Sequence, residues 1–201
     1  MGVLVACIGD SITAGSPLWD PDPVLRAGIA APDERSQWPW WAGQARPELE
    51  FRNHGVNGER TDEIAARLDA ALDGAGALVV EGGINDVVQG RPIDDAARSL
   101  AAMVERGLAL GLPVALANVL PWNNGDGDAA ERIVRLNELV RGVAADLGVP
   151  LLPFNETLAA PDDPRRMPPP YTDDGNHPSV EGHRLLGALL QPGRGATWLR
   201  S

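Results

Sequence analysis

Four short blocks of residues, spread from one end of the chain to the other, carry the groups that a serine enzyme uses for acyl transfer. The blocks are Gly9-Asp10-Ser11, Gly58, Gly83-Ile84-Asn85-Asp86 and Asp174-Gly175-Asn176-His177. Ser11 supplies a nucleophile, and Gly58 and Asn85 supply donors for a developing oxyanion. His177 supplies a base, and Asp174 supplies a carboxylate to orient that base. The order and placement of the four blocks predict nucleophilic catalysis, although each block alone is common by chance.

The choice of base is narrow, because the chain has only three histidines. His177 lies in a Pro- and Gly-rich loop, and a single turn of that loop brings the Asp174 carboxylate to its imidazole. Asp173 is a neighbouring carboxylate that competes for the same role. His183 falls within the last helical pattern, which favours a structural role with its ring either hydrogen-bonded or solvated.

The remaining sequence predicts the elements that must position these groups. Apolar runs predict strands, and these runs alternate with helical patterns. The predicted strands cover residues 3–8, 49–56, 77–81, 113–119 and 149–154. Helical patterns lie at 61–72, 100–108, 133–147 and 179–190, with Thr61 and Ser179 as expected caps. The alternation predicts one α/β domain over residues 1–201, with a parallel sheet covered on both faces. Ligands bind beyond the carboxyl ends of such strands, which is where the first three blocks fall.

Composition excludes several kinds of chemistry. All 17 positively charged side chains are arginines, so a catalytic lysine, a Schiff base and a Walker-type lysine are excluded. The net charge of −11 disfavours nucleic acid and anionic membranes as partners. Cys7 is the only cysteine, so no internal disulfide forms, and its apolar strand predicts an inert buried thiol. The first apolar run is too short to span a membrane and lacks a basic leader, so the expected location is cytoplasmic.

The combined pattern resembles the SGNH hydrolase superfamily, the GDSL-type esterases and lipases. That family is named for Ser, Gly, Asn and His in four separated blocks, and the matching positions here are Ser11, Gly58, Asn85 and His177. The resemblance spans nearly the whole chain. It implies a flavodoxin-like three-layer α/β/α sandwich with a central, mostly parallel five-stranded sheet.

The resemblance also implies roles for individual groups. The N–H groups of Ser11 and Gly58 and the Asn85 amide would form the oxyanion hole, while Asp10 and Asp86 would act as structural supports. The chain contains no Gly-x-Ser-x-Gly, which argues against the α/β-hydrolase fold. No metal or organic cofactor is required.

The predicted activity is hydrolysis of carboxylic esters, as small-molecule substrates, through an acyl-Ser11 intermediate. Trp19, Trp122 and Asn123 suit a sugar face and its hydroxyls, which favours short-chain or acetyl esters, including those on carbohydrate. The irregular stretches 16–37 and 161–178 flank the proposed chemistry and are expected to shape the substrate site.

Other activities remain open from sequence. A lysophospholipase or thioesterase-type acyl hydrolase, or an O-acyltransferase, would use the same serine. A non-catalytic binding module would keep the motifs without the chemistry. A metal-dependent phosphoesterase would need four side chains gathered around a cation, namely Asp10, Asp86, Asp174 and His177.

Overall fold

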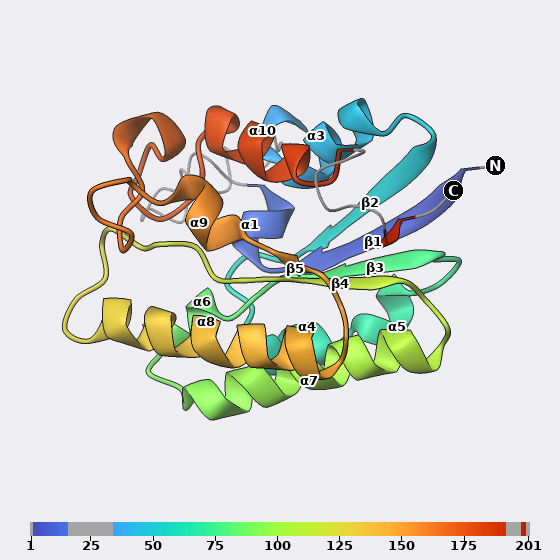
Figure 1. Cartoon of the computed structure of the whole chain (residues 1–201), viewed down its shortest axis with the longest axis horizontal. Helices are drawn as coiled ribbons and strands as arrows, with labels where there is room; N and C mark the ends of the chain where they lie inside the picture. The colour runs from blue at the N-terminus through green and yellow to red at the C-terminus, as the bar shows by residue number, and fades with distance from the viewer. Residues whose placement is uncertain (1, 16–33, 192–197, 200–201) are drawn as a thin grey trace.

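The computed structural model describes residues 2–15, 34–191 and 198–199, and these form a sheet between two layers of helices (Figure 1). The strands are β1 (Val3–Gly9), β2 (Leu49–Gly55), β3 (Ala77–Val80), β4 (Val114–Ala117) and β5 (Leu151–Leu152). All neighbouring strands pair in parallel, in the order β2-β1-β3-β4-β5. This is the flavodoxin-like order, in which ligands bind where the strand order reverses, between β1 and β3. The predicted three-layer fold is therefore confirmed, with a sheet that is parallel throughout.

The helices form the two outer layers. The layer drawn above the sheet in Figure 1 holds α1 (Ser11–Ala14), α3 (Trp38–Ala45), α9 (Phe154–Leu158) and α10 (Val180–Ala188). There are also two short 3₁₀ helices: η1 (Glu34–Ser36) precedes α3, and η2 (Pro169–Tyr171) precedes α10. The opposite layer holds α4 (Thr61–Ala66), α5 (Leu68–Ala71), α6 (Ile84–Val88), α7 (Ile93–Ala109) and α8 (Ala129–Asp146). Across the described ranges, no helix combines the length and apolarity needed to cross a membrane.

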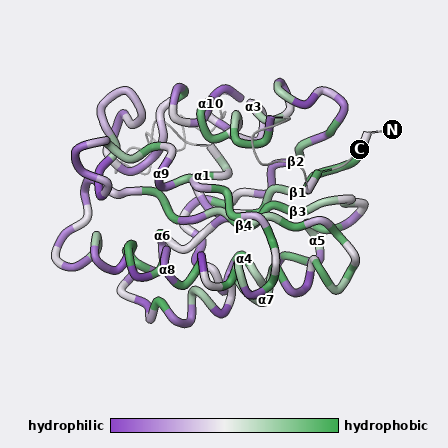
Figure 2. Tube along the Cα trace, viewed as in Figure 1, coloured by the Kyte–Doolittle hydropathy of each residue, from purple (hydrophilic) through white to green (hydrophobic). Residues whose placement is uncertain are grey.

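Each face of the sheet packs into its own hydrophobic core. Along β1, Val5 and Cys7 join the core under α3 and α10, whereas Ala6 and Ile8 join the core under α7 and α8. This alternation follows from the two-residue period of a strand. Hydrophobic residues accordingly concentrate along the central strands in Figure 2. Cys7 is fully buried, as predicted, and burial raises the pKa of its thiol.

Several local predictions differ from the structure. Thr61 does not cap α4: it is the first residue of the helix, and its hydroxyl and N–H both donate to the Asp86 carboxylate, each at 3.0 Å. The predicted helix 61–72 is broken at Arg67, whose N–H donates to the carbonyl of Ile64 (3.3 Å), three residues back. Ser179, by contrast, does cap α10, because its hydroxyl accepts from the Gly182 N–H. The strands predicted at 113–119 and 149–154 are shorter, because their outer residues leave the ladder.

Candidate active site

Ser11 stands at the junction of β1 and α1, next to the point where the strand order reverses. Asp10 directly follows β1 and caps α1, since its carboxylate accepts from the Ile12 N–H at 2.9 Å. The short helix crosses the end of β2 so closely that a Cβ on Gly55 would lie 2.0 Å from the Ala14 nitrogen. Glycine at position 55 therefore allows α1 to hold Ser11 at the rim, where 7% of the residue is exposed.

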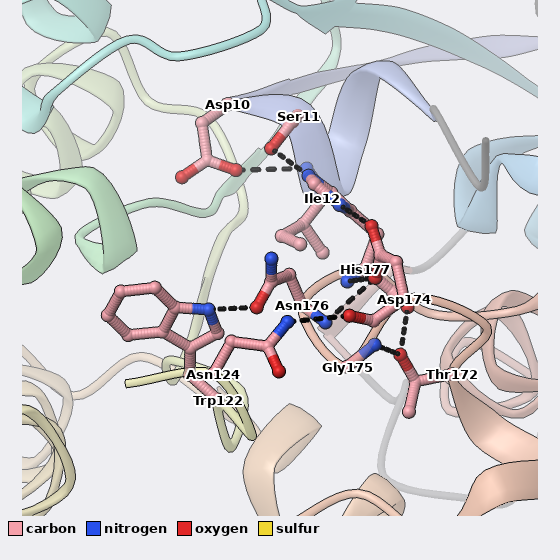
Figure 3. Close-up of polar contacts among 10 residues, drawn as sticks. All are labelled: Asp10, Ser11, Ile12, Trp122, Asn124, Thr172, Asp174, Gly175, Asn176 and His177. Atoms are coloured by element: carbon pink, nitrogen blue, oxygen red, sulfur yellow. Dashed lines mark hydrogen bonds and ion pairs between the residues drawn. The ribbon is translucent and has the colours of Figure 1, made fainter. Parts of the chain in front are cut away.

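The predicted nucleophile, base and carboxylate lie in one row, as Figure 3 shows. The Ser11 Oγ is 3.1 Å from Nε2 of His177, and Nδ1 of the same ring is 2.8 Å from Oδ2 of Asp174. Burial raises the pKa of Asp174, but hydrogen bonds from the His177 ring and from the His177 and Asn176 amides outweigh it and leave that pKa below its usual value. The carboxylate is thus ionised at neutral pH, and it favours the tautomer whose Nε2 lone pair faces Ser11.

The loop that carries His177 is held by the segment that follows β4. The Trp122 indole N–H donates to the Asn176 side chain, and the Asn124 amide donates to the Asp174 carbonyl at 2.6 Å (Figure 3). The Asn123 N–H donates to the Gly175 carbonyl at 2.8 Å. These contacts tie the carboxyl end of β4 to the loop and fix the position of the imidazole.

The side chain of Asn123, predicted to shape the substrate site, makes hydrogen bonds to another segment of the protein. It donates to the Met167 carbonyl (2.9 Å) and accepts from the Met167 N–H (2.8 Å). Trp122 is likewise engaged through its indole N–H. Trp19 and most of the stretch 16–37 lie outside the described residues. The stretch 161–178 contains η2 and the loop that carries His177.

The other predicted oxyanion donors follow β2 and β3. Asn85 is the second residue of α6, and its side-chain amide donates one hydrogen bond to the Glu59 carbonyl at 2.9 Å. An amide nitrogen carries two hydrogens, so one remains for another acceptor. Gly58 lies in the exposed turn after β2 with φ +80°, a conformation that favours glycine. Within the described part of the chain, the N–H groups of Ser11 and Gly58 donate to no acceptor.

A second carboxyl, which the sequence did not single out, lies behind Ser11. Oε2 of Glu81 accepts from the Asp10 N–H (3.2 Å) and from the Thr13 hydroxyl (2.9 Å). Burial raises the pKa of Asp10 to about 6, and burial together with the Asp10 charge raises that of Glu81 well above its usual value. Both carboxyls of this pair therefore hold their protons more tightly than exposed carboxyls do. The sequence signal that could have identified Glu81 was its position, because it is an ionisable residue directly after the buried strand β3.

His183 is the one histidine whose surroundings differ from expectation. It lies on the inner side of α10 and is fully buried, and in the described ranges neither ring nitrogen has a hydrogen-bond partner. The ring is thus neither hydrogen-bonded nor solvated. Burial, with a smaller contribution from His177, lowers its pKa to about 3.

This burial predicts a specific acid sensitivity. Because His183 binds a proton near pH 6.5 when unfolded and only near pH 3 when folded, protonation favours the unfolded chain between these values. Its contribution to the free energy of unfolding is intact above pH 6.5 and is lost as the pH falls to 3, by up to about 1.4 kcal/mol per pH unit. Urea unfolding at pH 7 and pH 5 is expected to show a smaller acid loss for His183→Leu than for the parent. An equal loss in both proteins would contradict this account.

A cavity of about 210 Å³ lies apart from these groups. It is lined from α8, α9 and the segment after α9, including Ile133, Asn137, Asn155 and Arg165. None of the predicted site residues lines it. The polar side chains of Asn137 and Asn155 are already bonded to backbone groups of Val119. This cavity is therefore separate from the candidate active site.

Comparisons with known proteins agree with this architecture. The fold is similar to that of a G-D-S-L family protein from Desulfitobacterium hafniense DCB-2, with 24% identity, coverage of 92% of this chain and 96% of that chain, and a TM-score of 0.76. It is similar to a member of the lipolytic protein G-D-S-L family from Veillonella parvula DSM 2008, with 20% identity, coverage of 94% and 97%, and a TM-score of 0.73. It is also similar to the psychrotrophic esterase EstA from Pseudoalteromonas sp., with 19% identity, coverage of 92% of each chain, and a TM-score of 0.67.

The sequence itself gives the family. No curated protein matches the chain. The model of the GDSL-like Lipase/Acylhydrolase family, in contrast, matches residues 7–185, a range that contains Ser11, Gly58, Asn85 and His177. Since this match covers most of the sequence, the chain belongs to the GDSL-like Lipase/Acylhydrolase family of hydrolases.

Proposed function

We propose that this protein is a serine esterase that hydrolyses short-chain carboxylic esters through an acyl intermediate on Ser11. The observation that carries the proposal is the row of hydrogen bonds from Ser11 Oγ to His177 Nε2 (3.1 Å) and from His177 Nδ1 to Asp174 Oδ2 (2.8 Å). A hydroxyl, an imidazole and an ionised carboxylate in this order form an activated nucleophile.

In the first half-reaction, His177 takes the proton of Ser11 while Oγ forms a bond to the acyl carbon. The carbonyl π electrons move to oxygen, and the oxyanion receives hydrogen bonds from the N–H groups of Ser11 and Gly58 and from the second amide hydrogen of Asn85. The bond to the alcohol oxygen then breaks, and the alcohol leaves with the proton held by His177.

In the second half-reaction, water replaces the alcohol. His177 takes a proton from the water as its oxygen attacks the acyl carbon, and the same donors hold the second oxyanion. The bond from the acyl carbon to Oγ then breaks, and the proton returns to Ser11. The products are one carboxylic acid and one alcohol, and every step uses groups of this chain.

The proposal of a short acyl group rests on the surroundings of Ser11. Only 7% of the residue is exposed, which favours a small acyl group over a long chain. The 210 Å³ cavity, a size suited to an apolar tail, is lined by other residues. Acetylated carbohydrates are one class of small ester that fits this description.

The test measures turnover of p-nitrophenyl acetate, butyrate and octanoate together with labelling by a fluorophosphonate. Because EstA was crystallised in a form inhibited by monoethylphosphonate, a phosphonate is a suitable probe. We expect the acetate to be turned over fastest, and one phosphonyl group per chain on the peptide that contains Ser11. An absence of both turnover and labelling would contradict the proposal and favour a binding module.

Two further outcomes would revise the substrate while keeping the nucleophile. Preference for octanoate would favour a lysophospholipase or thioesterase-type acyl hydrolase. Formation of a new ester when a sugar or alcohol acceptor is added, at the expense of free acid, would favour an O-acyltransferase. Product analysis by mass spectrometry distinguishes the two.

A further inference from the structure

Arg67 connects three segments that end near the candidate active site. It stands at the break between α4 and α5, with φ −108° and ψ 6°, and its side chain is 24% exposed. Its Nη2 donates to the Gly9 carbonyl (2.8 Å) and its Nη1 to the His54 carbonyl (2.5 Å). Its Nε donates to Oε2 of Glu59 at 2.6 Å. One guanidinium thus holds the end of β1, the end of β2 and the turn after β2.

Each proposed oxyanion donor is adjacent to one of these contacts. Gly9 lies two residues before Ser11. Glu59 directly follows Gly58, and the carbonyl of Glu59 accepts the hydrogen bond from the Asn85 amide at 2.9 Å. Since each donor must lie about 2.7–3.1 Å from the developing oxyanion, a group that fixes all three segments controls the geometry of the donors relative to one another.

The contacts use a property that only arginine has. A guanidinium presents five N–H donors in a rigid plane, so it can bond to several acceptors in fixed directions, whereas a lysine ammonium acts as a compact charge. Glu59 pairs with this guanidinium, and both side chains are partly buried. The bond to Gly9 adds to the strand ladder, because the Val56 N–H donates to the same carbonyl at 3.0 Å.

We propose that Arg67 is a positioning residue that sets the geometry of the oxyanion hole by joining the end of β1 to the turn carrying Gly58 and Glu59. This inference rests on the proposed function, because it assigns Arg67 a role in the same reaction. Arg67 bonds to Glu59 and to two backbone carbonyls rather than to the proposed triad, and we infer that it acts through Gly58, Asn85 and the strand end that leads to Ser11.

The test compares kcat and KM for p-nitrophenyl acetate in the parent, Arg67→Met and Arg106→Met. Displacing catalytic groups by about 1 Å costs on the order of 10²-fold in rate, so Arg67→Met is expected to lose kcat on that scale with KM essentially unchanged. Arg106→Met is the matched control, because Arg106 also pairs with a carboxylate, that of Asp69 (2.9 Å), but on an exposed surface. It is expected to keep the parent kcat. Rates are divided by the folded fraction of each variant, measured by urea unfolding, so that unfolded protein does not count.

Two further variants separate positioning from stability. Arg67→Lys keeps the charge on a flexible aliphatic stem but not the three directed bonds, so it is expected to lose most of the same kcat. The double variant Arg67→Met/Asn85→Ala is expected to lose far less than the product of the two single losses, because both changes damage one oxyanion hole. A multiplicative loss, or full kcat in Arg67→Lys, would overturn the inference. An inactive parent would instead count against the proposed function.

Discussion

Ser11→Ala is expected to lower kcat for p-nitrophenyl acetate by on the order of 10⁶-fold, the loss measured when the serine or histidine of such a triad is removed. The Ser11 hydroxyl contacts Nε2 of His177 at 3.1 Å and takes no part in the cap of α1 or in the strand ladder, so its removal leaves both intact. The variant should therefore unfold at the parent's urea midpoint while failing to react with the fluorophosphonate.

The same experiment has an internal check in the partner of Ser11. His177→Ala is expected to show a similar loss, and the double variant should be no slower than either single variant, because the two residues act as one unit. If Ser11→Ala turned over the ester at the parent's rate, the nucleophile would have to be another group. Losses that multiplied in the double variant would show that the two residues act independently.

Asp174→Asn is expected to lower kcat by about 10⁴-fold through the wrong tautomer of His177. Oδ1 of Asp174 accepts two backbone hydrogen bonds, from the N–H groups of Asn176 (2.8 Å) and His177 (2.7 Å). In the variant these donors hold the amide oxygen in the place of Oδ1, so the NH₂ group faces Nδ1 of the imidazole. Nδ1 must then accept, which puts the ring proton on Nε2, where it cannot take the proton of Ser11.

The neighbouring carboxylate gives a matched control for this change. Asp173 is exposed, and Asp173→Asn alters the net charge by the same amount one residue away. Steady-state rates from pH 5 to pH 9 are expected to be those of the parent for Asp173→Asn and to be low throughout for Asp174→Asn. Equal losses in the two variants would indicate a general charge effect, and an active Asp174→Asn would remove Asp174 from the mechanism.

The sequence predicted the scaffold because apolar periodicity depends on residues close together in the chain. Continuous apolar runs gave the strands, and their polar successors gave the rim that holds Ser11 and Asn85. The ends of elements were less accurate: the strand predicted at 149–154 spans only Leu151–Leu152 in the ladder. A ladder ends where a neighbouring strand turns away, and that neighbour's path is not encoded in the run itself.

The contacts around the candidate site were harder to predict, because each depends on segments far apart in sequence. In the sequence, Arg67 is an arginine within the helical pattern at 61–72, and nothing near it in the chain indicates its partners. Only folding brings it to the carbonyls of Gly9 and His54. Trp122 was predicted to shape the substrate site, and its indole N–H donates to Asn176, 54 residues away, a partner that the sequence did not indicate. The sequence allowed us to predict which types of side chain lie near the candidate site, but it did not allow us to predict the hydrogen-bond partners of these side chains.

The distance in sequence between the nucleophile and the base also bears on when the protein becomes active during synthesis. Ser11 and His177 are 166 residues apart, and α10, which follows His177, packs so closely on α3 that a Cβ on Gly187 would lie 2.5 Å from that of Trp41. A nascent chain that has not yet reached residue 177 has no base to place beside its serine. The proposed esterase activity is therefore expected to appear during translation only after the segment that carries His177 has been made and has folded against Ser11, later than the five strands of the sheet are made.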